Sequence, residues 1–168
     1  DPNKTHNRFN VKKVIEKSLD LTKYQLEKEG ISVTFSIQDD IDIYGFENEL
    51  THVILNLINN SKDALVENKI KNKEIWIVVK TTEQKVLINV IDNAGGIEND
   101  IMSKVFYFYF TTKHKSVGTG IGLYMSKQMI EKHMTGKIWC KNIKHKMHST
   151  ELMACTMFTI EIPKEFSN

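Results

Sequence analysis

Two asparagines and an aspartate near the middle of the chain are spaced as neighbours on one face of a helix. Asn56, Asn60 and Asp63 lie at positions i, i+4 and i+7, beside an apolar stripe of the same period. Both residue types are unfavourable inside helices, because their side chains compete for backbone hydrogen bonds. Their amide and carboxylate oxygens are suitable ligands for a hard cation such as Mg²⁺, which is commonly shared with phosphates. The alternative is a solvated helix face that binds nothing.

A second candidate segment is a glycine-containing turn, Asp92–Ile97, directly after an apolar strand pattern. Its two adjacent glycines permit positive φ angles and a close approach of the backbone to a ligand. A carboxylate held at a strand end can accept a hydrogen bond from an exocyclic amine such as that of adenine, and such a bond contributes about 1.5–3 kcal/mol. The alternative is an ordinary turn between two elements.

A third segment, Gly118–Leu123, has glycines at alternate positions at the start of a helical pattern. Open backbone N–H groups and the helix dipole favour phosphate at such a place. The spacing G-x-G-x-G differs from the dinucleotide-binding fingerprint, and the P-loop sequence does not occur in the chain. The His-Arg-Asp and Asp-Phe-Gly sequences of eukaryotic-type protein kinases do not occur either. The alternative is a flexible loop that leads into a helix.

Five consecutive aromatic residues, 106–110, lie between the two glycine segments and lead into Thr111, Thr112 and Lys113. An aromatic anchor followed by a polar segment has the character of a lid that closes over a ligand. The alternative, for most of the five aromatic side chains, is packing in the core.

Apolar periodicity predicts the elements that must position these segments. We expect helices over 11–28, 47–67 and 121–134, and strands over 31–37, 41–44, 74–80, 85–91, 136–141 and 157–162. Strands that pair largely with their sequence neighbours indicate the α+β class. We therefore expect a two-layer α/β sandwich, in which a mixed, largely antiparallel sheet of about five strands is covered on one face by about three helices.

The composition restricts the class of protein. The 168 residues are 40% hydrophobic and 26% charged, as in soluble globular domains, and the net charge of +2 gives no argument for a nucleic-acid partner. No apolar run approaches the roughly 18 residues of a membrane span. Cys140 and Cys155 do not make a disulfide framework and favour a reducing compartment. We expect a cytoplasmic domain without a nucleic-acid partner.

Taken in order, these segments resemble the motifs of the ATP-binding catalytic domain of sensor histidine kinases, a Bergerat-fold ATPase related to gyrase B, MutL and the heat-shock ninety chaperone. Asn56–Ala64 is similar to the N box, Asp92–Ile97 to the first glycine box, Phe106–Lys113 to the F box and Gly118–Leu123 to the second glycine box. The resemblance covers residues 9–163 and implies ATP and Mg²⁺ as ligands.

The resemblance also implies a role for each matching position. Asn56 and Asn60 would be the catalytic residues, with Asn60 as the Mg²⁺ ligand and Asn56 at the metal or the phosphates. Asp92 would bind the adenine amine, and Gly96 would leave room for the base. The positions implied in ATP binding are Asn60, Asp63, Asp92, Ala94, Gly96, Ile97, Thr112, Lys113, Gly118, Thr119, Gly120, Ile121, Gly122, Leu123 and Thr156.

The chain departs from the family pattern at four places. Tyr107–Phe108 stands where the F box usually has Glu-Pro, and Ala94 replaces a common glycine. Cys155 precedes Thr156 where the last strand usually carries Gly-Thr, so its side chain could crowd the adenine pocket. Asp63 stands where many of these kinases have a lysine that touches phosphate. The lid and the adenine pocket are therefore the places where nucleotide binding could differ from that of the family.

The position four residues before Asn60 bears on the reaction. ATPases of this superfamily carry a glutamate there that activates water, whereas this chain carries Asn56, which cannot act as a general base. The resemblance therefore implies phosphoryl transfer to a protein rather than hydrolysis. None of the six histidines is followed by Glu or Asp, as the acceptor histidine normally is. We expect the acceptor on a dimerisation domain outside this chain, a response regulator as a further partner, and a homodimeric full-length protein.

Residues 1–8 are expected to be the tail of a preceding dimerisation helix or linker, and residues 9–168 the catalytic domain, because Asp1–Lys4 resembles the end of the kinase's dimerisation helix. The chain does not begin with Met, so we expect a piece of a longer protein, which could be anchored in the inner membrane. Two alternatives stay open: an anti-sigma-type serine kinase, and a degenerate module that binds nucleotide or scaffolds a partner.

His145 and His148 could be half of a metal site or part of a solvated basic loop.

Overall fold

A mixed sheet of five strands, in the order β2-β4-β5-β7-β6, organises the domain. The computed structural model describes residues 6–107, 121–146 and 151–165. In this sheet the β2–β4 pair is parallel, and the other three pairs are antiparallel. The strands are β2 (Ser32–Ile37), β4 (Glu74–Thr81), β5 (Lys85–Asp92), β6 (Lys137–His145) and β7 (Met153–Pro163).

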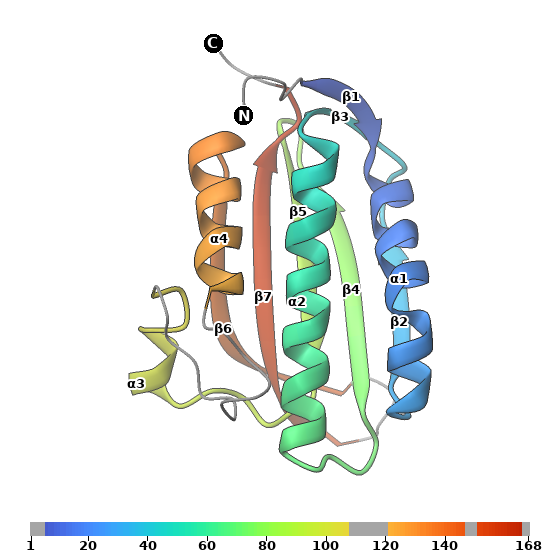
Figure 1. Ribbon diagram of the computed structural model, residues 1–168, viewed down its shortest axis with the longest axis vertical. Coiled ribbons are helices and arrows are strands. Elements are labelled where there is room, and N and C mark those ends of the chain that lie inside the picture. The colour runs from blue at the N-terminus through green and yellow to red at the C-terminus, as the bar shows by residue number, and fades with distance from the viewer. Residues whose placement is uncertain (1–5, 108–120, 147–150, 166–168) are drawn as a thin grey trace.

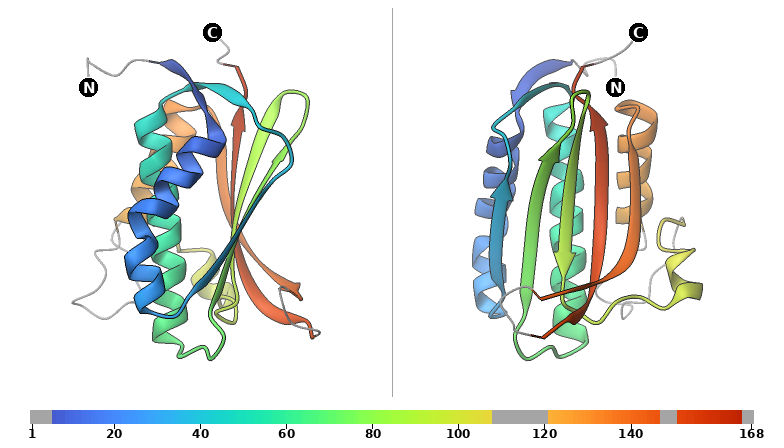
Figure 2. Two further views of the ribbon diagram at one scale, coloured as in Figure 1. Left: turned by 90° about the vertical axis from the view of Figure 1, so that its right-hand side faces the viewer. Right: turned by 180° about the vertical axis from the view of Figure 1, so that it is seen from behind.

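Three helical segments cover one face of the sheet (Figures 1 and 2). They are α1 (Val11–Lys28), α2 (Glu47–Glu67) and α4 (Gly122–Gln128), which continues as the π-helix η1 (Met129–His133). The expected α+β sandwich, with a largely antiparallel sheet and helices on one face, is therefore confirmed. Within the described ranges, no helix combines the length and the apolar character needed to span a membrane.

Three short elements complete the fold, and the sequence pattern predicts one of them. The strand expected over 41–44 is β3 (Asp42–Gly45), which pairs with β1 (Asn7–Asn10) in a small antiparallel sheet. The helix α3 (Asn99–Met102) follows the glycine turn after β5. β1 has a single buried residue and α3 has none, so neither shows a hydrophobic period, whereas exposed and buried residues alternate along β3.

The central helix α2 packs its apolar stripe on the sheet. Its fully buried apolar side chains recur at helical spacing and are Leu50, Val53, Ile54, Leu57, Ile58 and Leu65. They share one core cluster with alternate strand residues such as Ile77, Val90 and Phe158, each at most 1% exposed. Because successive strand residues point to opposite faces, this packing decides which side chains of β5 and β7 meet the helices.

The opposite face of the sheet carries a second, smaller apolar cluster. Ile91 and Cys155 are buried there and contact the partly buried Trp76. His145 packs against Trp76 edge to face, with the ring centroids 4.4 Å apart. One of the two histidines considered for a metal site therefore contributes to this cluster, while His148 lies outside the described residues.

The structure corrects the expected boundaries of the last helix and the last hairpin. Strands β6 and β7 stay paired from Asn142–Thr156 to His145–Met153, so much of the expected connection is strand. The added part of β6 contains the polar residues Asn142, Lys144 and His145, which interrupt the apolar pattern in the sequence, although an edge strand accommodates such side chains in solvent. The helix expected over 121–134 changes to a π-helix, because Met134 N–H bonds to Met129 O, five residues back, at 3.2 Å.

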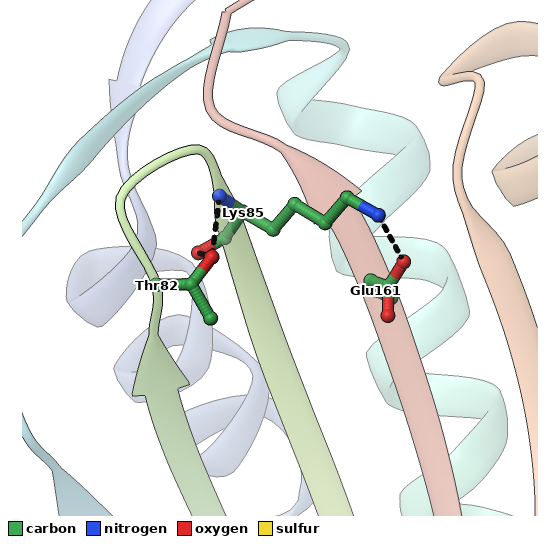
Figure 3. A network of polar contacts seen from close by, with 3 residues as sticks. All are labelled: Thr82, Lys85 and Glu161. Atoms are coloured by element: carbon green, nitrogen blue, oxygen red, sulfur yellow. Dashed lines mark hydrogen bonds and ion pairs between the residues drawn. The ribbon is translucent and has the colours of Figure 1, made fainter.

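A polar network ties the β4–β5 turn to β7 at the end of the sheet (Figure 3). The Lys85 backbone N–H donates to Thr82 Oγ1 at 3.0 Å, and Lys85 Nζ lies 2.9 Å from Glu161 Oε1. The Lys85 side chain is 48% exposed, so the ion pair contributes about 0–1 kcal/mol.

Candidate functional site

Asp92, the last residue of β5, presents a buried carboxylate. The residue is 2% exposed, and Oδ1 accepts a hydrogen bond from the Ala94 N–H at 3.1 Å. Burial raises the pKa of Asp92 from 3.8 to about 6, while the Ser61 hydroxyl and the Ala94 N–H lower it by stabilising the ionised form. Among the described residues, no basic side chain forms an ion pair with this carboxylate. Its remaining lone pairs are therefore available to a donor on a ligand.

Two buried hydroxyl residues flank Asp92. Thr156 on β7 is its register partner and is 4% exposed. Ser61 on α2 is fully buried, and its hydroxyl is near enough to Asp92 to lower the pKa of the carboxyl, although it forms no hydrogen bond of full geometry. The motifs assign Ser61 no role. A serine inside the apolar stripe of α2, four residues after Leu57, was the signal that could have identified it.

Asn56 joins the middle of α2 to the start of α4. Its Nδ2 donates to Ser126 Oγ at 3.1 Å and to the Gly122 carbonyl at 3.4 Å. The amide nitrogen is thereby directed towards α4, which leaves Oδ1 as an acceptor. Ser126 is fully buried and lies outside the four motifs, so sequence analysis missed this contact. Nothing in the sequence relates two residues 70 positions apart.

Asn60 and Asp63 lie on the same helix as Asn56, and both are half-buried. The Asn60 side chain makes no hydrogen bond to any residue that the structure describes, so its amide oxygen remains available as a ligand. Asp63 Oδ1 lies 3.6 Å from Nζ of Lys62. One or two amide oxygens fit Mg²⁺, which keeps most of its coordination shell for water and phosphate oxygens.

The glycine turn after Asp92 has the backbone conformation that its sequence predicts. Gly95 and Gly96 have φ angles of 104° and 86°, in the region that favours glycine. The turn is held at Ile97, whose N–H donates to Asn142 Oδ1 at 2.8 Å and whose carbonyl accepts from Asn142 Nδ2 at 2.6 Å. Asn142 belongs to β6 and to none of the four motifs.

The start of the turn is held by a different asparagine. Asn68, just after α2, donates from Nδ2 to the Ala94 carbonyl at 2.9 Å. At the other end, a Cβ atom added to Gly96 would lie 2.9 Å from Asn142 Oδ1. The resemblance implies that glycine at position 96 leaves room for a base. The structure gives two further reasons for a glycine there, which are its positive φ angle and the closeness of the Asn142 amide.

The aromatic segment is described only at its beginning. Phe106 is half-buried and packs edge to face on Phe158, with the centroids 6.1 Å apart, and Lys127 Nζ lies 5.3 Å from its ring centroid. Tyr107 is 59% exposed. At the start of α4, Ile121 and Leu123 are half-buried. The expected site residues that lie outside the described ranges are Thr112, Lys113, Gly118, Thr119 and Gly120.

Cys155 does not crowd the carboxylate face. Its side chain lies in the cluster with Ile91 on the opposite side of the sheet, because consecutive residues of β7 alternate between faces. Cys140 on β6 instead packs against the core on the helix side. Burial raises the pKa of the Cys140 thiol to about 12, and the charge of Asp92 adds to this effect. Both cysteines are free thiols.

Comparison with known proteins identifies the family of this chain. Residues 45–165 match the family model described as histidine kinase-, DNA gyrase B-, and HSP90-like ATPase. Sporulation kinase A of Bacillus subtilis is 32% identical over 126 residues, which are 74% of this chain and 20% of that protein. Sensor histidine kinase ZraS of Salmonella typhi is 32% identical over 141 residues, which are 82% of this chain and 28% of that protein.

A solved structure extends the similarity to nearly the whole chain. The catalytic domain of histidine kinase ThkA superposes with a TM-score of 0.81 at 26% identity, covering 96% of this chain and 97% of that domain. The curated relatives are longer, and this chain spans about a fifth of the first of them. The chain belongs to the histidine kinase-, DNA gyrase B- and HSP90-like ATPase family, and within it to the ATP-binding catalytic domains of sensor histidine kinases.

Proposed function

We propose that this domain binds ATP through Asp92 and Mg²⁺ through Asn60, and that the whole protein transfers the γ-phosphate to a histidine on a dimerisation domain. The observation that supports this most directly is the buried Asp92 carboxylate, which has no cationic partner among the described residues and a pKa raised to about 6. A fixed acceptor at the end of a strand, beside a glycine turn, matches the donor edge of adenine.

The residues of the chain would act by binding and orientation. When bound, Mg²⁺ neutralises the phosphate charge that develops during transfer. Asn60 would hold it through the amide oxygen, and Asn56, whose nitrogen is directed to Ser126, would present its oxygen to the metal or the phosphates. Asp92 would hold the base at the other end. Since Asn56 cannot remove a proton, this arrangement favours transfer to a protein acceptor over activation of water.

The remaining parts of the site are proposed from the motif positions. The backbone N–H groups of Gly118, Gly120 and Gly122 would bind the phosphates. Thr112 and Lys113 would belong to a lid that covers the nucleotide.

The partners are proposed from the relatives. Histidine kinase ThkA, whose fold this chain shares, has been solved in complex with the response regulator protein TrrA. We propose that a response regulator likewise accepts the phosphoryl group from the protein to which this domain belongs, and that this protein is a homodimer. A cytoplasmic location would supply ATP and would suit the two free thiols.

Calorimetric titration with ATP, with and without Mg²⁺, tests the proposal. We expect a Kd in the micromolar range, about −6 to −8 kcal/mol, for the wild-type chain and a loss of most of this affinity in Asp92→Asn. Asp20→Asn, on the exposed side of α1, is the matched control and should bind as wild type. A folded wild-type chain without measurable ATP affinity would contradict the proposal and favour a scaffolding role. Phosphotransfer is then measured with a supplied histidine-bearing dimerisation domain.

A further inference from the structure

Asn142 lies in line with the proposed adenine acceptor, on the outermost strand of the sheet. Asp92 on β5 pairs in register with Thr156 on β7, and Thr156 pairs in register with Asn142 on β6. Side chains directly opposite one another in antiparallel strands point to the same face. The edge strand therefore places an amide on the face of the sheet that carries the Asp92 carboxylate.

The Asn142 amide bonds with both of its ends to the backbone of one residue, Ile97. Oδ1 accepts from the Ile97 N–H at 2.8 Å, and Nδ2 donates to the Ile97 carbonyl at 2.6 Å. The arrangement replaces the pair of backbone bonds that a further strand would make with Ile97. A side chain bound in this way is specific, because an ionised acid at position 142 could only accept a hydrogen bond and an apolar residue could satisfy neither group.

Gly95 and Gly96, next to this contact, have no side chains that could fix the turn. Both adopt positive φ angles, and a glycine loses more conformational freedom on becoming ordered than any other residue. Ordering one residue costs about 1–2 kcal/mol of backbone entropy. If the turn were already ordered, a ligand would not have to meet this cost on binding.

We propose that Asn142 is a positioning residue for nucleotide binding: it holds the Gly96–Ile97 backbone in place next to Asp92 without touching the nucleotide. This inference rests on the proposed ATP binding at Asp92. It makes the affinity for nucleotide depend on an edge-strand residue that lies outside all four motifs.

The test compares Asn142→Ala and Asn142→Leu with the wild-type chain. Without these two hydrogen bonds the Gly96–Ile97 backbone would have to be ordered when the nucleotide binds, at about 1–2 kcal/mol per residue, which should raise the Kd by about tenfold. Because Asn142 acts at the end of the site that binds adenine, ATP and ADP should lose affinity by the same factor. The ratio of the Kd values with and without Mg²⁺ should stay unchanged. Asn48→Ala, an exposed asparagine in the first turn of α2, is the matched control.

Hydrogen exchange of single amides supplies a readout independent of nucleotide. The Ile97 amide should exchange faster in the Asn142 variants, whereas the Ala94 amide, which is bonded to Asp92, should not. An unchanged Ile97 amide, or a faster one with ATP affinity within twofold of wild type, would overturn the role of Asn142 and leave ATP binding intact. A wild-type chain that binds neither ATP nor ADP would overturn both proposals.

Discussion

At the scale of single residues, Asp92 combines a cost in stability with a benefit in binding. Its carboxylate is buried with hydrogen bonds from its own turn but no described cation to compensate its charge, so the ionised form is disfavoured. The interval between 3.8 and about 6 corresponds to about 3 kcal/mol. Such a carboxylate is an acceptor that water solvates poorly, and a donor on a ligand gains accordingly.

Replacement of Asp92 by asparagine should therefore stabilise the free domain. Above pH 6 the folded state carries the whole cost of the buried charge, and the free energy of unfolding of Asp92→Asn should exceed that of wild type by about 1–3 kcal/mol. The unfolded chain takes up this proton only near pH 3.8, so the difference should diminish as the pH falls from about 6 to about 4. Urea unfolding at pH 7.5 and pH 4 measures it. A variant less stable than wild type at pH 7.5 would contradict this account.

The same carboxylate predicts how ATP binding depends on pH. Protonated Asp92 is a poorer acceptor, so the association constant should fall by up to about tenfold per pH unit below about pH 6. Calorimetric titrations between pH 8 and pH 5 measure this change. The phosphates of ATP titrate in a similar range, so the same series with Asp92→Asn is the control. A wild-type profile parallel to that of the variant would show that Asp92 does not accept the adenine donor.

At the scale of the elements, the contact between α2 and α4 determines how the asparagines of α2 are presented. The Asn56 amide nitrogen bonds to Gly122, the first residue of α4, and to Ser126 one turn further along. α4 follows directly on the second glycine segment, so the position of that segment relative to the proposed metal ligand depends on this contact.

Removal of the Ser126 hydroxyl tests that dependence. In Ser126→Ala the Asn56 amide keeps only its longer bond to the Gly122 carbonyl, and the Kd for ATP with Mg²⁺ should rise by about three- to tenfold, in keeping with one lost hydrogen bond. The Kd without Mg²⁺ should change less, because adenine binding at Asp92 is unaffected. Calorimetry under both conditions measures the two effects. Ser36→Ala on the exposed edge of β2 is the control, and equal losses with and without Mg²⁺ would contradict the role of Ser126.

The turn after η1 allows a second test at this scale. Thr135 has φ 51°, a conformation unfavourable for a β-branched residue, so Thr135→Gly should raise the free energy of unfolding by about 1 kcal/mol. The next residue should behave in the opposite way, because a Cβ on Gly136 would collide with the carbonyl of Glu161. Gly136→Ala should therefore destabilise by about 3 kcal/mol or more. Urea unfolding of both variants decides this; a stabilised Gly136→Ala would refute the packing of this turn on β7.

At the scale of the whole molecule, β1 and the carboxyl end of β7 lie at the end of the sandwich opposite to the carboxyl end of β5 (Figures 1 and 2). The sheet and helices between them form one core, which includes Leu57, Val90 and Phe158. A ligand at Asp92 therefore contacts elements that unfold together with the rest of the domain.

Nucleotide should accordingly stabilise the entire domain. At a concentration of ATP one hundred times the Kd, the free energy of unfolding should rise by about 2.7 kcal/mol. Thermal unfolding with and without Mg-ATP, followed by a probe of the sheet and by a probe of α1, should show the same shift for both. A shift restricted to one probe would mean that the site unfolds separately from the remainder of the domain.

The sequence alone determined the longer helices, the approximate positions of the sheet strands and the order of the motifs. The apolar periods of residues 11–28 and 47–67 delimit α1 and α2 to the residue, because local packing on one face imposes a period that the chain itself displays. The glycine turn could also be predicted from the sequence, since the positive φ angles at Gly95 and Gly96 favour glycine over other residue types. Asp92 was identifiable from its place between an apolar strand and these glycines.

Only the tertiary structure decided how those residues are held and charged. The pKa of Asp92 depends on burial under α2, the Asn56 amide is directed by Ser126, and Ile97 is fixed by Asn142 on the edge strand. The residues in these contacts are 31 to 70 positions apart in the sequence. They meet only because the helices pack on the sheet and the strands pair with one another. A local pattern carries no information on such pairs, because the distance between them is set by how the layers pack and not by the spacing of residues along the chain.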